Sequence, residues 1–351
     1  MIPFVFDIPA RRVVFGRGSI ARLHEEVTRL GARRALIIST PSEQHLAKDA
    51  AGRLGDLAAG LFTEAVMHTP IDMVRAARRR AAELRADCYV AIGGGSTIGA
   101  GKSIALETGN PLVAVPTTYA GSEMTPIYGI TEGTLKKTGR DDKVLPKTVI
   151  YDVDLTLSLP PQVSGPSGMN AIAHCVEGLY TRETNPILQL MAADGIRALA
   201  RSLPVIVREP HNIEARSDAQ YGAWLAGTVL GAAGTALHHK LCHTLGGTFN
   251  LPHAETHAVI LPHAMAYNSE AAPEAMRIIA DALGVDDAAR AMYDLAARLN
   301  APPSLKQLGM PEEGLDRAAQ LATENPYWNP RPLERAGLRE LLENAYHGRR
   351  P

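Results

Sequence analysis

Residues 89–103 read YVAIGGGSTIGAGKS, and this stretch decides the fold of the N-terminal half. The run YVAIGG is apolar up to its glycines, as strands of a parallel sheet are when both faces are buried. Residues 98–107 then follow a helical pattern, and a second apolar run, PLVAVPTT, occupies residues 111–118. Strand, helix and strand in this order predict a βαβ unit within a parallel sheet that helices cover.

The sequence on either side extends this pattern and then changes. Further strands are predicted at FVFDIP (4–9), RRVVFG (11–16), ALIIS (35–39) and TVIYD (148–152), and helices at 19–30, 44–54 and 73–85. From Pro160 onward helix follows helix without a convincing strand. We expect breaks in this region at Pro186, Pro204, Pro252, Pro273 and Pro302. The chain is therefore predicted to form an α/β domain at 1–157 and an all-helical domain at 158–351.

Composition excludes several classes of protein. A formal net charge of -1 over 351 residues gives no long-range field to attract nucleic acid or an anionic membrane. No apolar stretch approaches the roughly 20 residues of a membrane span, and the charge order of the N-terminus is wrong for a signal peptide. The three cysteines form no CxxC pair and no disulfide framework. We expect a cytoplasmic protein whose partners are small molecules.

The glycine turn between the first apolar run and its helix is a candidate site for a dinucleotide. Gly94, Gly95 and Ser96 lie there. Glycines let the backbone approach a pyrophosphate, and a helix N-terminus offers free N–H groups. GAGKS at 99–103 only resembles the end of a P-loop, because it lies within the predicted helix and lacks the first glycine of that motif. The N-terminal domain is thus predicted to bind NADH or NADPH.

Residues that follow two other predicted strands complete the predicted cofactor site. Thr117, Thr118 and Ser122 follow the second apolar run, where their hydroxyls can donate to phosphate or ribose from the carboxyl edge of the sheet. Thr40 ends the strand that would meet the adenosine ribose. An acidic residue at that point would repel a 2′-phosphate. Because Ser39 and Thr40 are neutral, both NADH and NADPH remain possible.

The histidines of two segments indicate an active site. The segments are GMNAIAHCVEGLY (168–180) and HKLCHTLGGTFNLPH (239–253). His239 and His243 are four residues apart, hence on one face of a helix, and Asn170 and His174 are related in the same way on an earlier helix. His253 enters from the turn that follows. We expect these five side chains to converge.

Other residues near this cluster have less defined roles. The pair Gly246 and Gly247 would permit close backbone packing. His238, His257 and His263 are candidates either for the site or for structural hydrogen bonds, and the sequence leaves both possibilities open.

The segments GMNAIAHCVEGLY, HKLCHTLGGTFNLPH and GGGSTIGAGK resemble signature segments of the iron-containing alcohol dehydrogenase family, and the likeness runs over nearly the whole chain. The resemblance implies an N-terminal dinucleotide-binding domain similar to that of dehydroquinate synthase, an all-helical C-terminal domain and an active site in the cleft between them. In metal-dependent members an aspartate and three histidines hold iron or zinc. The matching positions here are Asn170, His174, His239 and His253, while His243 matches a further active-site histidine that is not normally a ligand.

Asn170 departs from the family pattern. A neutral amide in place of the only anionic ligand leaves a divalent cation without charge compensation, so no metal is expected. Together with NAIAH, TTYAGSEMTPIYG, KKTGRDDKVLP and NPYWNPRP, this departure resembles the metal-free branch that reduces maleylacetate in the bacterial breakdown of aromatic compounds. The resemblance implies a homodimer that uses NADH or NADPH to form 3-oxoadipate.

The residue chemistry agrees with such a reaction. Hydride addition to an alkene conjugated with a ketone yields an enolate, which must be stabilised and then protonated at carbon. His243 is our first candidate for the general acid, because an imidazole titrates near neutrality. Asn170, His174, His239 and His253 are expected to form the substrate pocket.

A dicarboxylate also needs cations that offset its desolvation. Protonated histidines, Lys240 or Arg140 could supply them, and Tyr119 and Tyr327 could reach the cleft.

Two other functions remain open. One is an iron- or zinc-dependent alcohol dehydrogenase in which the Asn170 amide oxygen still coordinates, and the other is a lyase similar to dehydroquinate synthase.

Overall fold

The computed structural model describes residues 4, 6, 11–133, 135–324 and 327–351. The chain divides into two compact units, one within residues 8–159 and the other over residues 160–351. The strand predicted at 4–9 lies outside the described residues, apart from Phe4 and Phe6. The two predicted fold classes, α/β and then all-helical, are confirmed.

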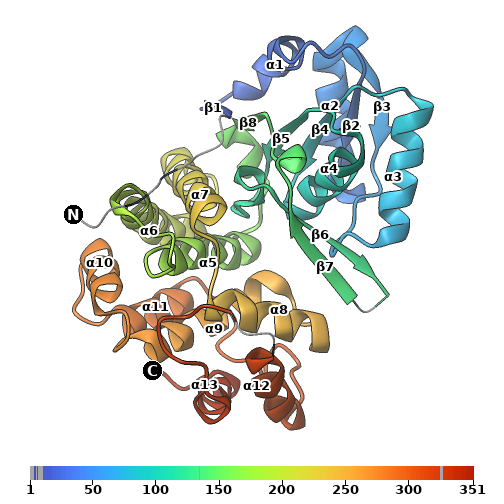
Figure 1. Cartoon of the computed structure of the whole chain (residues 1–351). Coiled ribbons are helices and arrows are strands. Elements are labelled where there is room, and N and C mark those ends of the chain that lie inside the picture. Colours follow the sequence, from blue (N-terminus) through green and yellow to red (C-terminus); the bar gives the residue numbers. More distant parts are fainter. Residues whose placement is uncertain (1–3, 5, 7–10, 134, 325–326) are drawn as a thin grey trace. The chain divides into compact units, whose positions relative to one another are not determined.

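A six-stranded parallel sheet forms the centre of the α/β unit, in the order β1-β8-β5-β4-β2-β3 (Figure 1). Its strands are β1 (Arg12–Phe15), β2 (Ala35–Ile38), β3 (Ala58–Phe62), β4 (Cys88–Gly93), β5 (Leu112–Pro116) and β8 (Thr148–Tyr151). Every residue of β2, β4, β5 and β8 is buried. This burial on both faces explains why the four strands have no polar alternation in the sequence.

Helices cover both faces of this sheet. The helices are α1 (Leu23–Arg29), α2 (Gln44–Leu54), α3 (Ile71–Glu83) and α4 (Gly95–Thr108). Ile37 packs in one apolar core with α1 and α2, whereas its neighbours Leu36 and Ile38 pack in the other with α3 and α4. Successive side chains of a strand point to opposite faces, so one strand contributes to both cores.

An antiparallel hairpin extends from the α/β unit (Figure 1). It consists of β6 (Ile127–Glu132) and β7 (Leu135–Arg140), and Ile127 pairs with Arg140 in its register. The hairpin follows the loop after β5, so it continues from the carboxyl edge of the sheet.

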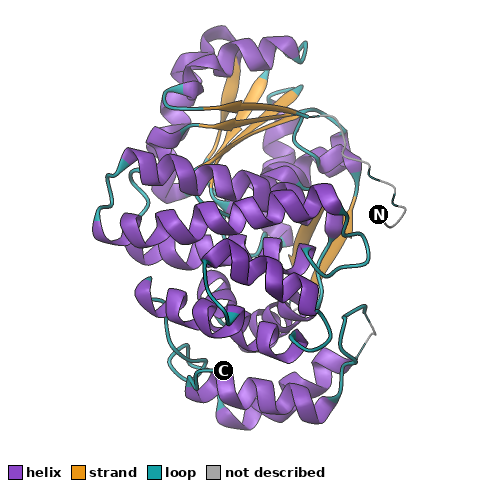
Figure 2. Cartoon of the chain, turned by 90° about the vertical axis from the view of Figure 1, so that its left-hand side faces the viewer, coloured by secondary structure: helices purple, strands orange, loops and turns teal. Residues whose placement is uncertain are grey.

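The second unit is built from nine helices and contains no strand among its described residues (Figure 2). They are α5 (Pro161–Gly178), α6 (Pro186–Arg208), α7 (Ile213–Ala233), α8 (Leu237–Phe249), α9 (His253–Asn268), α10 (Pro273–Leu283), α11 (Ala288–Arg298), α12 (Leu315–Thr323) and α13 (Arg335–His347). α8, α9, α12 and α13 share one apolar core. No helix in the described part of the chain has the length and apolar character that spanning a membrane requires.

The predicted break at Pro204 is wrong, because α6 runs through this residue to Arg208. A proline inside a helix removes one backbone hydrogen bond. Leu199, Leu203 and Ile206 are fully buried on either side of it, so packing holds the helix together. Pro186 and Pro273 stand instead at the first positions of α6 and α10, where a missing N–H costs nothing.

Candidate active site and cofactor site

Four histidines that were predicted to form the active site lie together in the helical unit. His174 comes from α5, His239 and His243 from α8, and His253 is the first residue of α9. The ring centroids of His174 and His239 are 4.9 Å apart, those of His239 and His243 6.1 Å, and those of His243 and His253 6.3 Å. Asn170 lies one turn before His174 on α5.

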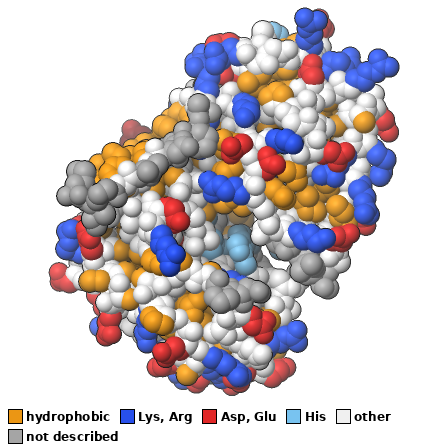
Figure 3. All heavy atoms as spheres, viewed as in Figure 1, with side chains coloured by type: hydrophobic (Ala, Val, Ile, Leu, Met, Phe, Trp, Pro, Cys, Tyr) orange, Lys and Arg blue, Asp and Glu red, His pale blue; other side chains and the backbone are white. Residues whose placement is uncertain are grey.

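The cluster has a buried part and an exposed part. Asn170, His174 and His239 are buried, with exposed fractions of 6%, 4% and 4%. His243 and His253 are exposed, and histidine atoms are visible at the surface of the helical unit in Figure 3. A ligand that binds here would therefore meet His243 and His253 first.

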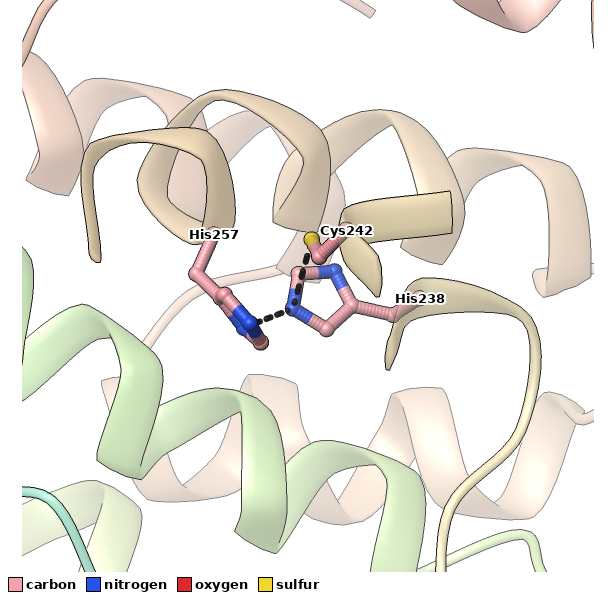
Figure 4. A group of neighbouring side chains, drawn as sticks. All are labelled: His238, Cys242 and His257. Atoms are coloured by element: carbon pink, nitrogen blue, oxygen red, sulfur yellow. Dashed lines mark hydrogen bonds between the residues drawn. The ribbon is translucent and has the colours of Figure 1, made fainter. Parts of the chain in front are cut away.

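Figure 4 shows a second pair of histidines, His238 and His257. The ring centroid of His257 lies 4.9 Å from that of His239 and 4.4 Å from that of His253. His238 and His257 are fully buried, and 2.8 Å separates His238 Nε2 from His257 Nδ1. The Cys242 sulfur lies 3.8 Å from the same nitrogen of His238. Two imidazole nitrogens on one zinc ion would be about 3.3 Å apart, so 2.8 Å indicates a hydrogen bond. The possibility of structural hydrogen bonding, left open by the sequence, therefore applies to His238 and His257.

Glu177, which the sequence analysis missed, connects α5 to α8. Its carboxylate is fully buried and accepts hydrogen bonds from the backbone N–H groups of Ala236 at 2.9 Å and His238 at 2.7 Å. Its Oε2 atom also lies 2.6 Å from Nδ1 of His239. α8 has no capping side chain of its own, so Glu177 supplies the acceptor that the first turn of a helix requires.

The signal for Glu177 was present in GMNAIAHCVEGLY. The residue stands three positions after His174 and seven after Asn170, which places all three on one helical face. It is the only acidic residue of α5, and an acid is buried only when it has partners.

Burial also sets the charge of the inner histidines. Desolvation, followed by the neighbouring histidines, lowers the pKa of His174 well below its usual range. The same causes lower the pKa of His238 and His257. These three imidazoles are neutral near pH 7, and His174 is therefore not a cation for a dicarboxylate.

Lys240 is a cation adjacent to the cluster. It follows His239 on α8, and its ammonium nitrogen lies 5.5 Å from the centre of the Tyr327 ring. The Tyr327 hydroxyl is buried and has no hydrogen-bond partner within the described residues. Of the other candidates, Arg140 ends β7 and Tyr119 is fully buried in the α/β unit.

The expectation for the glycine pair of α8 is wrong. A Cβ atom added to Gly247 would meet no atom within 4 Å, and one added to Gly246 would meet only the Leu251 carbonyl at 3.7 Å. Neither position needs glycine for close packing.

The predicted cofactor residues lie at the carboxyl edge of the parallel sheet. Gly94 caps α4, and Gly95 and Ser96 form its first turn. A Cβ atom on Gly94 would lie 3.1 Å from the side chain of Thr118, so the glycine turn and the loop after β5 are in contact. The Thr118 hydroxyl is buried and has no hydrogen-bond partner among the described residues, which leaves it available to a ligand.

The hydroxyls of Thr40 and Thr117 have a partner that the sequence analysis missed. Thr117 donates to Glu43 Oε1 at 2.7 Å, and Thr40 donates to Glu43 Oε2 at 3.0 Å. Glu43 ends a short 3-10 helix, Pro41–Glu43, immediately after β2. A carboxylate therefore lies between the two strand ends where only neutral groups were expected.

Ser122 is held by a buried lysine. The Lys102 ammonium donates to the Ser122 carbonyl at 2.6 Å, and it also contacts the Ser122 hydroxyl and the carbonyl oxygens of Thr125 and Ile127. Burial lowers the pKa of Lys102 to about 7. GAGKS indeed lies inside a helix, α4, and its lysine holds the loop after β5.

Comparison with known proteins identifies the family. A model described as "Iron-containing alcohol dehydrogenase" matches residues 10–153, and one described as "Fe-containing alcohol dehydrogenase family, C-terminal" matches residues 165–346. The chain belongs to the iron-containing alcohol dehydrogenase family. It is therefore an oxidoreductase.

Several members of this family are similar to the chain over their full length. A maleylacetate reductase of Burkholderia cepacia is 57% identical over 351 residues, with 100% of both chains covered. Among solved structures, a putative alcohol dehydrogenase of Ralstonia eutropha has a TM-score of 0.99 at 58% identity, and a maleylacetate reductase of Agrobacterium tumefaciens has a TM-score of 0.97 at 53% identity. Both structures cover 100% of this chain and are themselves covered completely.

The family name implies iron, and the histidine cluster fits a metal only in part. Asn170 Oδ1 and His239 Nε2 are buried and have no hydrogen-bond partner in the described part of the chain. Such atoms have the character of ligands, and the bond from His239 Nδ1 to Glu177 leaves a lone pair on Nε2. The set of Asn170, His174, His239 and His253 nevertheless carries no anionic ligand. It fits a divalent cation in ligand type and does not fit it in charge.

Proposed function

We propose that this protein is a maleylacetate reductase, which reduces the conjugated C=C bond of maleylacetate to give 3-oxoadipate. Similarity over the full chain carries the proposal, because relatives of this name are 51–57% identical over at least 99% of its length. We further propose that the protein acts as a homodimer in the cytoplasm, during the breakdown of aromatic compounds.

The proposed reaction needs a hydride, a proton and a site for a dianion. Bound NADH or NADPH would supply the hydride, which adds to the alkene carbon remote from the ketone. The electron pair of the C=C bond then becomes an enolate, and a proton delivered to its carbon completes 3-oxoadipate. The chain must therefore hold two carboxylates, stabilise the enolate oxygen and donate one proton.

We assign the proton to His243. It is exposed on α8, so a ligand and solvent can both reach it, and its ring lies 6.1 Å from that of His239 and 6.3 Å from that of His253. The buried amide of Asn170, with His174, His239 and His253, would form the pocket around the enolate and one carboxylate. Lys240, which follows His239 on α8, is our candidate for an ion pair with a carboxylate.

We assign cofactor binding to the carboxyl edge of the sheet. Gly94, Gly95 and Ser96 would bind the pyrophosphate through the N-terminus of α4. The unpartnered hydroxyl of Thr118, in contact with Gly94, supports this assignment. The further residues proposed for this site are Thr40, Thr117 and Ser122.

We also propose that the reaction needs no metal. None of the four residues that match the family's metal positions has an acidic side chain, and hydrogen-bond donors can stabilise an enolate where a Lewis acid would otherwise act. One observation favours the second candidate, an iron- or zinc-dependent alcohol dehydrogenase. Glu177 accepts from His239 in the way that a carboxylate commonly supports a ligating histidine, and its charge lies close to the cluster.

One assay separates the two functions. NADH absorbance is followed with fresh maleylacetate in excess EDTA, and the purified protein is analysed for iron and zinc. We expect rapid oxidation of NADH and metal far below one equivalent. A protein that is inactive on maleylacetate, but oxidises NADH with simple aldehydes once iron or zinc is added, would be the metal-dependent dehydrogenase.

The role of His243 has its own test. We expect His243→Ala to lower kcat by about 10² to 10⁴, the usual contribution of a positioned general acid, and to leave the Kd of NADH unchanged. His347→Ala, which removes an exposed histidine from α13, is the matched control. Unchanged turnover in His243→Ala would show that the proton comes from another group.

A further inference from the structure

We propose that Glu43 makes the cofactor site selective for NADH over NADPH, by accepting hydrogen bonds from the adenosine ribose. The inference rests on the proposed use of a nicotinamide cofactor. The strand end at Ser39 and Thr40 does not decide between NADH and NADPH, because neither of those residues carries a charge.

The topology brings Glu43 to the position where a ribose is expected. β2 and β4 are parallel neighbours, and Ile38 pairs with Ala91. The glycine turn follows β4 and the helix that ends at Glu43 follows β2, so both lie at the same edge of the sheet. In open α/β folds with a glycine turn, the adjacent strand end meets the ribose of a bound dinucleotide.

The carboxylate of Glu43 rests directly against the glycine turn. A Cβ atom added to Gly93 would lie 2.6 Å from Glu43 Oε2. The hydroxyls of Thr40 and Thr117 hold the two carboxylate oxygens at 3.0 and 2.7 Å. Glu43 is therefore fixed beside the predicted pyrophosphate site by residues from two different strand ends.

The remaining hydrogen-bonding capacity of Glu43 suits a diol. An ionised carboxylate accepts about four hydrogen bonds and donates none, and the two threonines use two of these positions. The side chain is half-buried, and no Lys, Arg or His forms an ion pair with it among the described residues. Ribose hydroxyls can donate to the free positions, whereas the 2′-phosphate of NADPH would place a second anion beside an uncompensated one.

Fluorescence titration of the purified protein with NADH and NADPH tests the proposal without turnover. We expect the wild type to bind NADH at least about tenfold more tightly. Glu43→Gln should narrow this ratio, mainly by strengthening NADPH binding, since it removes the charge and keeps the shape. Glu43→Asp keeps the charge but shortens its reach, so it should weaken NADH binding and still disfavour NADPH.

Glu83→Gln is the matched control. Glu83 ends α3, at the opposite edge of the sheet, and pairs with Arg80, so the same change of charge there should leave the ratio unaltered. Thermal melting verifies that each variant is folded. Wild-type protein that binds neither nucleotide would overturn the proposed function itself. Equal binding of both nucleotides by the wild type, or an unchanged ratio in Glu43→Gln, would overturn this inference alone.

Discussion

Glu177 contributes both to the stability of the helical unit and to the orientation of an active-site histidine. It comes from α5, accepts the first free N–H groups of α8, and fixes the ring of His239 through Nδ1. Because one carboxylate performs these tasks, the start of α8 and the orientation of the His239 ring depend on each other.

Replacing this carboxylate by an amide should therefore affect stability as well as activity. In Glu177→Gln an NH₂ group faces backbone donors and a ring nitrogen, so buried hydrogen bonds are lost. We expect the free energy of unfolding to fall by about 3 kcal/mol, measured by urea denaturation, together with a large loss of turnover. Glu270→Gln, which changes an exposed glutamate of the same unit, should alter neither quantity. A loss of stability below about 1 kcal/mol would show that α8 does not depend on Glu177.

Sequence spacing predicted part of the candidate site and missed its charged residues. The four-residue spacings of Asn170 with His174 and of His239 with His243 follow from helix geometry, and the structure brings these imidazoles together. Glu177 had a signal in the sequence, because it is an acid in a largely apolar segment, but Glu43 and Lys102 had none. A charged residue at the start of a helix or within it has the same local pattern whether it faces solvent or a buried partner, and for these two residues only the tertiary fold distinguishes the cases.

Among the elements, the turn from β4 to α4 most strongly restricts which residue can occupy one of its positions. Gly93 has φ of +146°, and a Cβ atom there would lie 2.5 Å from the Thr97 hydroxyl and 2.6 Å from Glu43. Gly95, two residues later, has neither restriction, and its Cβ would make an ordinary contact at 3.7 Å with Ala120.

These two glycines form a matched pair for mutation. We expect Gly93→Ala to weaken NADH binding by at least tenfold and to lower stability by roughly 2 kcal/mol, since it introduces backbone strain and a steric clash. Gly95→Ala should preserve the fold, because alanine favours a helix. Fluorescence titration and thermal melting measure both effects. If the two variants had the same affinity for NADH and the same melting temperature, the turn would tolerate a side chain at Gly93.

Elements with strong patterns were predicted and weakly patterned ones were not. The helix predicted at 44–54 is α2 with the same limits. β3, AAGLF, escaped prediction because alanine and glycine have low β-propensity and the strand lies at the edge of the sheet. The hairpin of β6 and β7 also escaped, since its charged second strand, LKKTGR, has the composition of a loop.

At the scale of the whole molecule, the two units differ in how they respond to acid. His174, His238, His257 and His263 are buried in the helical unit, and desolvation lowers the pKa of each, that of His263 to about 4. Unfolded histidine has a pKa of about 6.5, so below that value the unfolded chain binds more protons than the folded one. The stability of the helical unit is therefore lost as pH falls from about 6.5 toward 4.

Glu123 and Lys102, two buried groups of the α/β unit, have no such effect in this range. Burial raises the pKa of Glu123, so its contribution to stability is lost as pH rises and is recovered on acidification. Lys102, with a pKa of about 7, is protonated in both folded and unfolded chains below that value. Acid should consequently destabilise the helical unit first.

Hydrogen exchange at about pH 7.5 and about pH 5, corrected for the intrinsic rate, measures this difference. We expect protection to fall in α5, α8 and α9 while β4 and β5 keep theirs. In His263→Phe, whose ring has no proton to gain, the acid-induced loss should be smaller by about 2 kcal/mol. His347→Ala, on the exposed face of α13, is the control. Uniform loss of protection in both units would contradict the assignment to buried histidines.

The buried amide of Asn170 is one substitution away from a carboxylate. Asparagine and aspartate have nearly the same shape, and their codons differ by a single base. One nucleotide change would thus place an anionic side chain one helical turn before His174 without repacking α5. Asn170→Asp would thus remove, by one substitution, the mismatch in charge between this set of side chains and a divalent cation.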